Sequence, residues 1–191
     1  MINDTNNCKI KGSLIKGLLY YMQKKWGKLY IESLKLPFKM EDLKDGRYYP
    51  YSWMRAIYNE LLKKNKGKEE LGFINAGRSV VESTMEGNFF VNYITQKRPL
   101  EKTFLTLLKA WEQESFEGVF KGSLIKNENK IIITLDQICD DKGEEICWLN
   151  LGGIEGVIKV SGKNATVKHT KCVFHGDEHC VYEIELKDKN R

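Results

Sequence analysis

The chain has 191 residues, a length that predicts one domain with a substantial core. Hydrophobic residues make up 41% and charged residues 30% of the sequence, which excludes a disordered chain. The formal net charge of +5 is small and scattered, so it does not indicate a nucleic-acid-binding surface. No apolar run reaches the roughly 18 residues of a membrane span, and the polar N-terminus lacks the apolar stretch of a signal peptide. We therefore expect a soluble, cytoplasmic protein.

The first 115 residues carry the apolar spacing of α-helices. Ser13 and Ser52 precede two of these patterns and are placed to act as N-caps, and Gly27 follows the first pattern as a C-terminal stop. Helices are expected over 14–26, 29–35 and 71–84, in a segment that starts at Ser52, around 89–93, and after Pro99. The sequence therefore predicts an N-terminal helical half over residues 1–115.

The helix after Pro99 has the clearest apolar stripe, because Phe104, Leu108 and Trp111 recur at helical spacing. Two interpretations of this stripe remain open: it is the wall of a ligand pocket, or it belongs to a filled core. An enclosed apolar cavity of roughly a few hundred cubic ångströms would favour the pocket.

After Ser115 the pattern changes to the alternation of β-strands. Strands are expected over 116–123, 130–136, 164–174 and 179–186, with a helix over 144–160 between the second and the third strand. The second half, residues 116–187, thus has the order β–β–α–β–β. Because no linker separates the two halves, we expect residues 1–191 to form one α+β domain.

Motifs for catalysis and nucleotide binding are missing. The sequence has no Walker loop, no Gly-x-Gly-x-x-Gly and no Gly-x-Ser-x-Gly, so it predicts no enzyme of those classes. Residues 1–115 contain no histidine, and their only cysteine is Cys8, so we expect no haem. Gly152 and Gly156 lie one helical turn apart, which indicates close helix packing, either within the chain or between two copies.

Most of the metal-binding residue types lie in the last third of the chain, where four of the five cysteines and all three histidines occur. In a cytoplasmic protein such a cluster indicates a metal site rather than a set of disulfides. Cys172 and Cys180 flank a predicted hairpin turn, and His169 lies three residues before the first of them. Cys147 lies at the start of the preceding helix. Three sulfurs and one imidazole suit tetrahedral Zn²⁺ in a structural site.

Two points about this cluster remain open. Residues three apart on a regular strand face opposite sides of the sheet, so His169 and Cys172 can meet only across a bulge or bend. Alternatively, the three cysteines are small buried hydrophobic residues and His169 lies at the surface.

The segment 144–186 resembles the C-terminal part of the 4-vinyl-reductase domain family. The matching text is EICWLNLGGIEGVIKVSGK followed by VKHTKCVFHGDEHCVYEIEL, a Cys-Trp helix and a Cys-x7-Cys hairpin. In the aromatic-sensing members of that family, zinc is bound by a helix cysteine, an acidic residue and the two hairpin cysteines. The resemblance implies that zinc binds Cys147, His169, Cys172 and Cys180, with a histidine in place of the acidic ligand.

The N-terminal segment KGSLIKGLLYYMQKKWG and the helix around Gly77-Arg78 are similar to the helical half of haem-nitric-oxide-binding (H-NOX) domains and their haemless relatives, a group that includes TRAPP trafficking subunits. The resemblance implies helices packed on a four- or five-stranded antiparallel sheet, with an apolar ligand cavity between the layers. The chain lacks the proximal histidine and the Tyr-x-Ser-x-Arg motif of H-NOX domains, so it resembles a haemless member.

Together these features predict a non-enzymatic sensor or binding module for a small apolar or aromatic molecule or a lipid, which passes its signal to a separate partner. The alternative is a dimeric scaffold or assembly protein of the TRAPP type, with the helix around Gly152 and Gly156 at its interface. A homodimer is expected, because relatives of this kind are often homodimers. An enclosed apolar cavity would favour sensing, and a flat exposed apolar patch would favour assembly.

Overall fold

The structure is a computed structural model of the chain. It describes residues 8–86, 97–110, 112, 116–117, 120–127, 129–137 and 143–187. The expected helix around 89–93 lies outside these residues, as do Trp111 and Cys139.

The helical half contains four of the expected helices at their expected places. They are α1 (Gly12–Trp26), α2 (Lys28–Ser33), α3 (Tyr51–Lys64) and α4 (Glu69–Glu86), and a fifth expected helix, α6 (Leu100–Ala110), follows Pro99. A short 3₁₀ turn, η2 (Met40–Asp42), lies between α2 and α3. Gly27 ends α1 with a φ of 89°, a conformation that glycine adopts without strain.

The predicted serine caps are wrong. Ser13 and Ser52 lie inside α1 and α3, whose N-caps are Lys11 and Pro50, and neither N-cap makes a side-chain capping hydrogen bond. Each helix begins earlier than expected because a short strand leads directly into it. These strands, β1 (Lys9–Lys11) and β2 (Tyr48–Pro50), pair with each other and, through β1, with β3 (Phe116–Glu117) in a small antiparallel sheet.

The main sheet has four antiparallel strands in the order β4-β5-β7-β6. The strands are β4 (Phe120–Asn127), β5 (Lys130–Gln137), β6 (Ala165–Lys171) and β7 (Cys180–Leu186), and α7 (Glu145–Val160) connects β5 to β6. The 3₁₀ turn η4 (Val173–His175) lies in the β6–β7 connection, so the third expected strand ends before Phe174. This architecture confirms the predicted α+β fold class.

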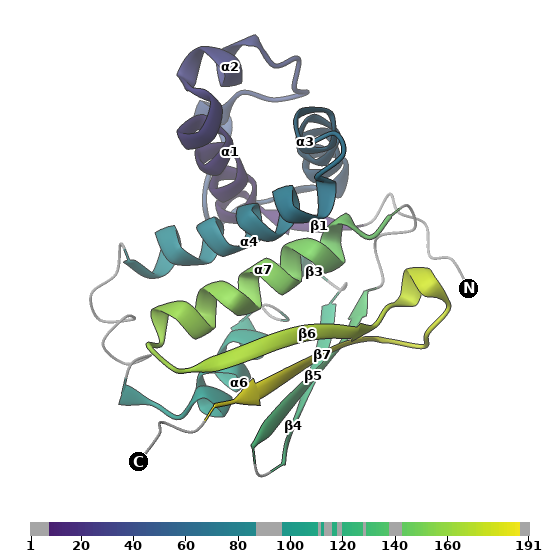
Figure 1. The fold of residues 1–191 in the computed structure, drawn as a ribbon. Coiled ribbons are helices and arrows are strands. Elements are labelled where there is room, and N and C mark those ends of the chain that lie inside the picture. The colour runs from purple at the N-terminus through teal and green to yellow at the C-terminus, as the bar shows by residue number, and fades with distance from the viewer. Residues whose placement is uncertain are drawn as a thin grey trace.

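Helix α7 lies between the sheet and α4, so it is the central layer of the molecule (Figure 1). Buried side chains from both halves of the chain, among them Leu18, Phe73, Ile154 and Ile133, belong to one hydrophobic core. Within the described residues, no helix combines the length and the apolar character needed to cross a membrane.

The small residues of α4 and α7 bring the two backbones into contact. A Cβ added to Gly77 would lie 2.0 Å from the carbonyl oxygen of Leu149, and one added to Gly152 would lie 1.9 Å from that of Ile74. Gly156 likewise faces the backbone of Arg78. These glycines therefore serve packing within the chain, and the proposed use of Gly152 and Gly156 as a dimer interface is wrong.

Candidate metal centre

The β6–β7 hairpin and the first turn of α7 bring the four predicted ligands together. His169 lies near the end of β6 and pairs with Tyr182 of β7. The register then shifts between His169 and Lys171 at a β-bulge, so the bulge required by the three-residue spacing is present. Cys172 follows the bulge, and Cys180 begins β7.

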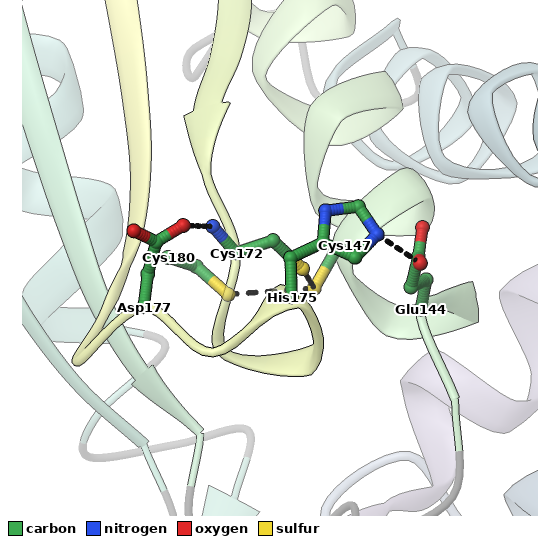
Figure 2. Close-up of polar contacts among 6 residues, drawn as sticks. All are labelled: Glu144, Cys147, Cys172, His175, Asp177 and Cys180. Carbon is green, nitrogen blue, oxygen red and sulfur yellow. Dashed lines mark hydrogen bonds and ion pairs between the residues drawn. The ribbon is translucent and has the colours of Figure 1, made fainter.

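One ligand atom from each of Cys147, His169, Cys172 and Cys180 lies within 4.8 Å of all the others. The Sγ atom of Cys147 lies 3.7 Å from that of Cys172 and 3.4 Å from that of Cys180 (Figure 2). A tetrahedral site with Zn–S bonds of about 2.3 Å separates its sulfur ligands by roughly 3.8 Å. The sulfur spacing is therefore close to that of a zinc site, and the cluster is able to hold a metal ion.

One of the three buried cysteines of the cluster, Cys180, favours the thiolate form. Cys147, Cys172 and Cys180 are free and buried. The pKa of Cys180 is lowered to about 5, first by the hydrogen bond from the Cys147 thiol and then by the neighbouring His169 imidazole. The same contact raises the pKa of Cys147. A buried thiolate is costly without a nearby positive charge, and a metal ion supplies that charge.

The surroundings of the His169 side chain are also those expected of a metal ligand. Nε2 of His169 is buried and has no hydrogen-bond partner of normal geometry among the described residues, and buried polar atoms in proteins are rarely left in this state. The imidazole lies on the ring of Tyr182, with centroids 4.6 Å apart. The alternative that His169 is an ordinary surface residue is therefore not favoured.

Two hydrogen bonds between Cys172 and Asp177 and one ion pair hold the loop that carries Cys172. The backbone N–H of Cys172 donates to Oδ2 of Asp177 at 2.8 Å, and the backbone N–H of Asp177 donates to the Cys172 carbonyl at 3.2 Å. His175, in η4, forms an ion pair with Glu144 at the start of α7 (Figure 2). This pair ties the loop to the helix that carries Cys147. None of these contacts was expected from the sequence, although the Gly-Asp pair at the turn was a signal for those of Asp177.

Cys8 behaves differently from the cysteines of the cluster, because it is disulfide-bonded. The expectation that the chain keeps its thiols free is therefore wrong at Cys8 and correct at the three cysteines of the cluster.

The space between α1, α3, α4 and α7 is where a ligand would lie among the helices. An apolar cavity of about 70 Å³ lies there, lined by residues such as Leu18, Met54 and Val80. Small-molecule sites usually have roughly 300–1,000 Å³, and all three histidines of the chain lie within residues 169–179. A haem does not fit this cavity.

The predicted pocket wall on α6 is only partly described. Phe104 and Leu108 are buried, at 1% and 4% exposure, which agrees with a core position as well as with a closed pocket. Trp111 lies outside the described residues. A ligand pocket bounded by this stripe therefore stays a prediction, with a filled core as its alternative.

A larger depression, which was not expected from the sequence, lies in the helical half. It has a volume of about 850 Å³ and is half open to solvent between α1, α2 and the segment 34–45. The signal that could have found it is the alternation of apolar and polar residues in LKLPFKM, residues 34–40, a segment that forms no strand.

The fold is a helical half packed on a four-stranded antiparallel sheet, and the site adds a candidate metal centre of three cysteines and one histidine. No family model matches the sequence, and no curated protein matches it either.

Solved structures do match. An H-NOX protein from S. oneidensis, a triple mutant in the Fe(II) ligation state, has a TM-score of 0.71 and 15% identity, covering 95% of this chain and 98% of its own. A double mutant of Tt H-NOX has a TM-score of 0.71 and 16% identity, with coverages of 94% and 96%. An Fe(II) unliganded H-NOX mutant from K. algicida has a TM-score of 0.67 and 13% identity, with coverages of 94% and 98%.

Proposed function

We propose that this chain is a non-enzymatic sensor module of H-NOX-like fold, stabilised by a structural Zn²⁺ bound to Cys147, His169, Cys172 and Cys180. The observation that carries the metal part is the convergence of these four ligand atoms within 4.8 Å. Four protein ligands fill a tetrahedral zinc site and leave no position for substrate or water, which supports a structural role. The metal would hold α7 against the β6–β7 hairpin, and the three thiols that would bind it are free.

Metal analysis of the whole chain, purified without chelator, tests this part. We expect about one zinc per chain by elemental analysis. After exchange with Co²⁺, the protein should show the intense visible absorption of a tetrahedral thiolate site. A zinc ratio near zero, with no cobalt spectrum after reconstitution under reducing conditions, would refute the metal part.

The sensor part concerns a small apolar or aromatic molecule or a lipid, with the signal passed to a separate partner. It is supported by the H-NOX-like fold, since the similar structures include H-NOX proteins in the Fe(II)NO and Fe(II)CO ligation states. The candidate metal ligands of this chain are cysteine and histidine side chains at the hairpin, and the cavity between the helices does not fit a haem. We therefore propose a haemless binding module.

Native mass spectrometry after incubation with a lipid extract tests the sensor part. A retained guest of defined mass would support it. The absence of any guest from the extract and from a panel of small aromatic molecules would refute it, whatever the zinc content.

The alternative of a dimeric scaffold is less well supported, because the glycines expected at its interface face α4. A homodimer remains a prediction of the resemblance. Light scattering at micromolar concentration would test it, and a monomer mass would contradict it.

A further inference from the structure

The depression beside α1 has the features of a site for an amphiphilic molecule. Its floor is apolar, with the fully buried Leu19 and Leu43 beneath it and the half-buried Ile31 at its surface. Its outer wall is the segment 34–40, in which Leu34, Leu36, Phe38 and Met40 alternate with exposed residues and line the depression. We call this depression, as lined by α1, α2 and residues 34–45, the α1 groove.

The α1 groove is elongated along the helix. The α1 residues that line it, from Lys16 to Gln23, span about 10 Å at the rise of an α-helix. Helix α2 contributes Ile31 at one end, and Lys44 and Asp45 lie at the other end, where Asp45 contacts Lys16. An apolar chain lying along the groove would therefore have its end near Lys44.

The charges around the α1 groove leave one positive charge uncompensated. Four lysines and three acidic residues line it. Three ion pairs use all of the acids: Lys16 with Asp45 at 2.8 Å, Lys28 with Glu32 at 3.5 Å, and Lys39 with Glu41 at 3.8 Å. The remaining lysine is Lys44, whose side chain has no ion pair or hydrogen bond within the described part of the chain.

The backbone of Lys44 is held firmly although its side chain is free. Its N–H donates to Oη of Tyr49 at 2.8 Å, and its carbonyl accepts from the N–H of Arg47 at 3.1 Å. The same carbonyl lies against Gly12, where a Cβ would come within 2.3 Å of it. The ammonium group is thus attached to an ordered backbone at the end of an apolar groove.

We propose that the α1 groove binds a free medium-chain carboxylate, with the alkyl chain on the apolar floor and the carboxylate paired with Lys44. A single negative charge matches the single uncompensated ammonium, and the volume of about 850 Å³ lies within the usual range of roughly 300–1,000 Å³ for small-molecule sites. The inference rests on the sensor part of the proposed function and is independent of the metal centre.

Calorimetric titration of the full chain with decanoate, below its micellar concentration, tests the proposal. Decyltrimethylammonium, which has the same alkyl length and the opposite charge, is the matched probe. We expect saturable binding of one decanoate per chain and at least about fivefold weaker binding of the ammonium amphiphile, as for a partly exposed charge pair. Equal binding of both probes, or no saturable binding of decanoate, would overturn the proposal.

Variants of residues in and beside the α1 groove test whether decanoate binds there. Lys44→Gln should weaken decanoate binding about fivefold and should not weaken binding of the ammonium amphiphile, because the variant removes an attraction for the first probe and a repulsion for the second. Lys35→Gln is the control, since Lys35 is exposed on the same segment and does not line the groove. Leu36→Glu, at a half-buried lining position, should abolish decanoate binding. Equal losses in the Lys35 and Lys44 variants would overturn the proposal.

Failure of the groove proposal can be distinguished from failure of the sensor function. If the lipid extract yields a guest but decanoate binds equally well to the Lys44→Gln variant, the groove assignment fails and the sensor function survives. If a second copy of the chain covers the groove instead, binding of decanoate should fall as protein concentration rises, which would also overturn the proposal.

Discussion

The imidazole of His169 lies flat on the ring of Tyr182, its cross-strand partner, with ring centroids 4.6 Å and ring planes 14° apart. Oη of the same tyrosine donates to the carbonyl of Cys147 at 3.0 Å. Tyr182 therefore touches both the strand histidine and the helix cysteine of the candidate metal centre. Such contacts outside the ligand set orient metal ligands and influence metal affinity.

Two variants of Tyr182 distinguish the effect of its ring stacking on His169 from the effect of its hydrogen bond to Cys147. Tyr182→Phe keeps the ring and loses the hydrogen bond to Cys147, so the free energy of unfolding should fall by about 1 kcal/mol while zinc affinity changes little. Tyr182→Leu removes the ring, and zinc affinity should fall by about tenfold. Competition with a chromophoric chelator measures both affinities. Equal zinc affinities in the two variants would contradict the orienting role of the ring.

Cys180→Ala should release the metal. The variant leaves three ligands and removes the thiolate whose pKa is already low, so zinc should be lost. Because metal binding contributes to folding free energy, the melting temperature should fall by roughly 5 °C or more. Cys8→Ala is the control for zinc content alone, because Cys8 lies outside the cluster and its replacement also breaks a disulfide, which lowers the melting temperature by itself. A Cys180→Ala protein that retains one zinc per chain would exclude the proposed ligand set.

Asp177 should tune zinc affinity through the backbone of Cys172. Asp177→Ala removes the acceptor of the Cys172 N–H, and we expect about tenfold weaker zinc binding. Asp177→Asn retains an oxygen acceptor at the same position and should restore most of the affinity. The chelator competition used for Tyr182 gives the measurement. Equal zinc affinities in the alanine and asparagine variants would show that the hydrogen bond has no such role.

Gly152→Ala should strongly destabilise the fold. The new Cβ would lie 1.9 Å from the carbonyl oxygen of Ile74, so α4 and α7 would have to move apart. We expect a loss of about 3 kcal/mol or more in the free energy of unfolding, measured by urea denaturation. Gly46→Ala is the matched control, because a Cβ there meets nothing within 4 Å. A Gly152→Ala protein as stable as the control would contradict the close packing of α4 and α7.

The sequence alone predicted the described helices, three of the four main strands and the four residues that meet in the candidate metal centre, whereas the expected strand over 116–123 is divided between β3 and β4 of two different sheets. Helical and strand periodicities depend on which side chains face the core, and that information is local. The spacing of His169 and Cys172 even predicted a bulge, which occurs between His169 and Lys171. The spacing of Cys172 and Cys180 predicted the hairpin on which the cluster forms.

Contacts between segments far apart in the sequence could be known only from the tertiary structure. The strands β1 and β2 exist because Ile10 pairs with Tyr49 and Phe116, and a three-residue strand has no periodicity of its own. For the same reason Ser13 and Ser52 could not be recognised as interior helix residues. The partner of Gly152 is a carbonyl 78 residues away, at Ile74. The α1 groove and its uncompensated Lys44 likewise depend on how a loop returns to α1, because ion pairs such as Lys16–Asp45 form between segments that only the fold brings together.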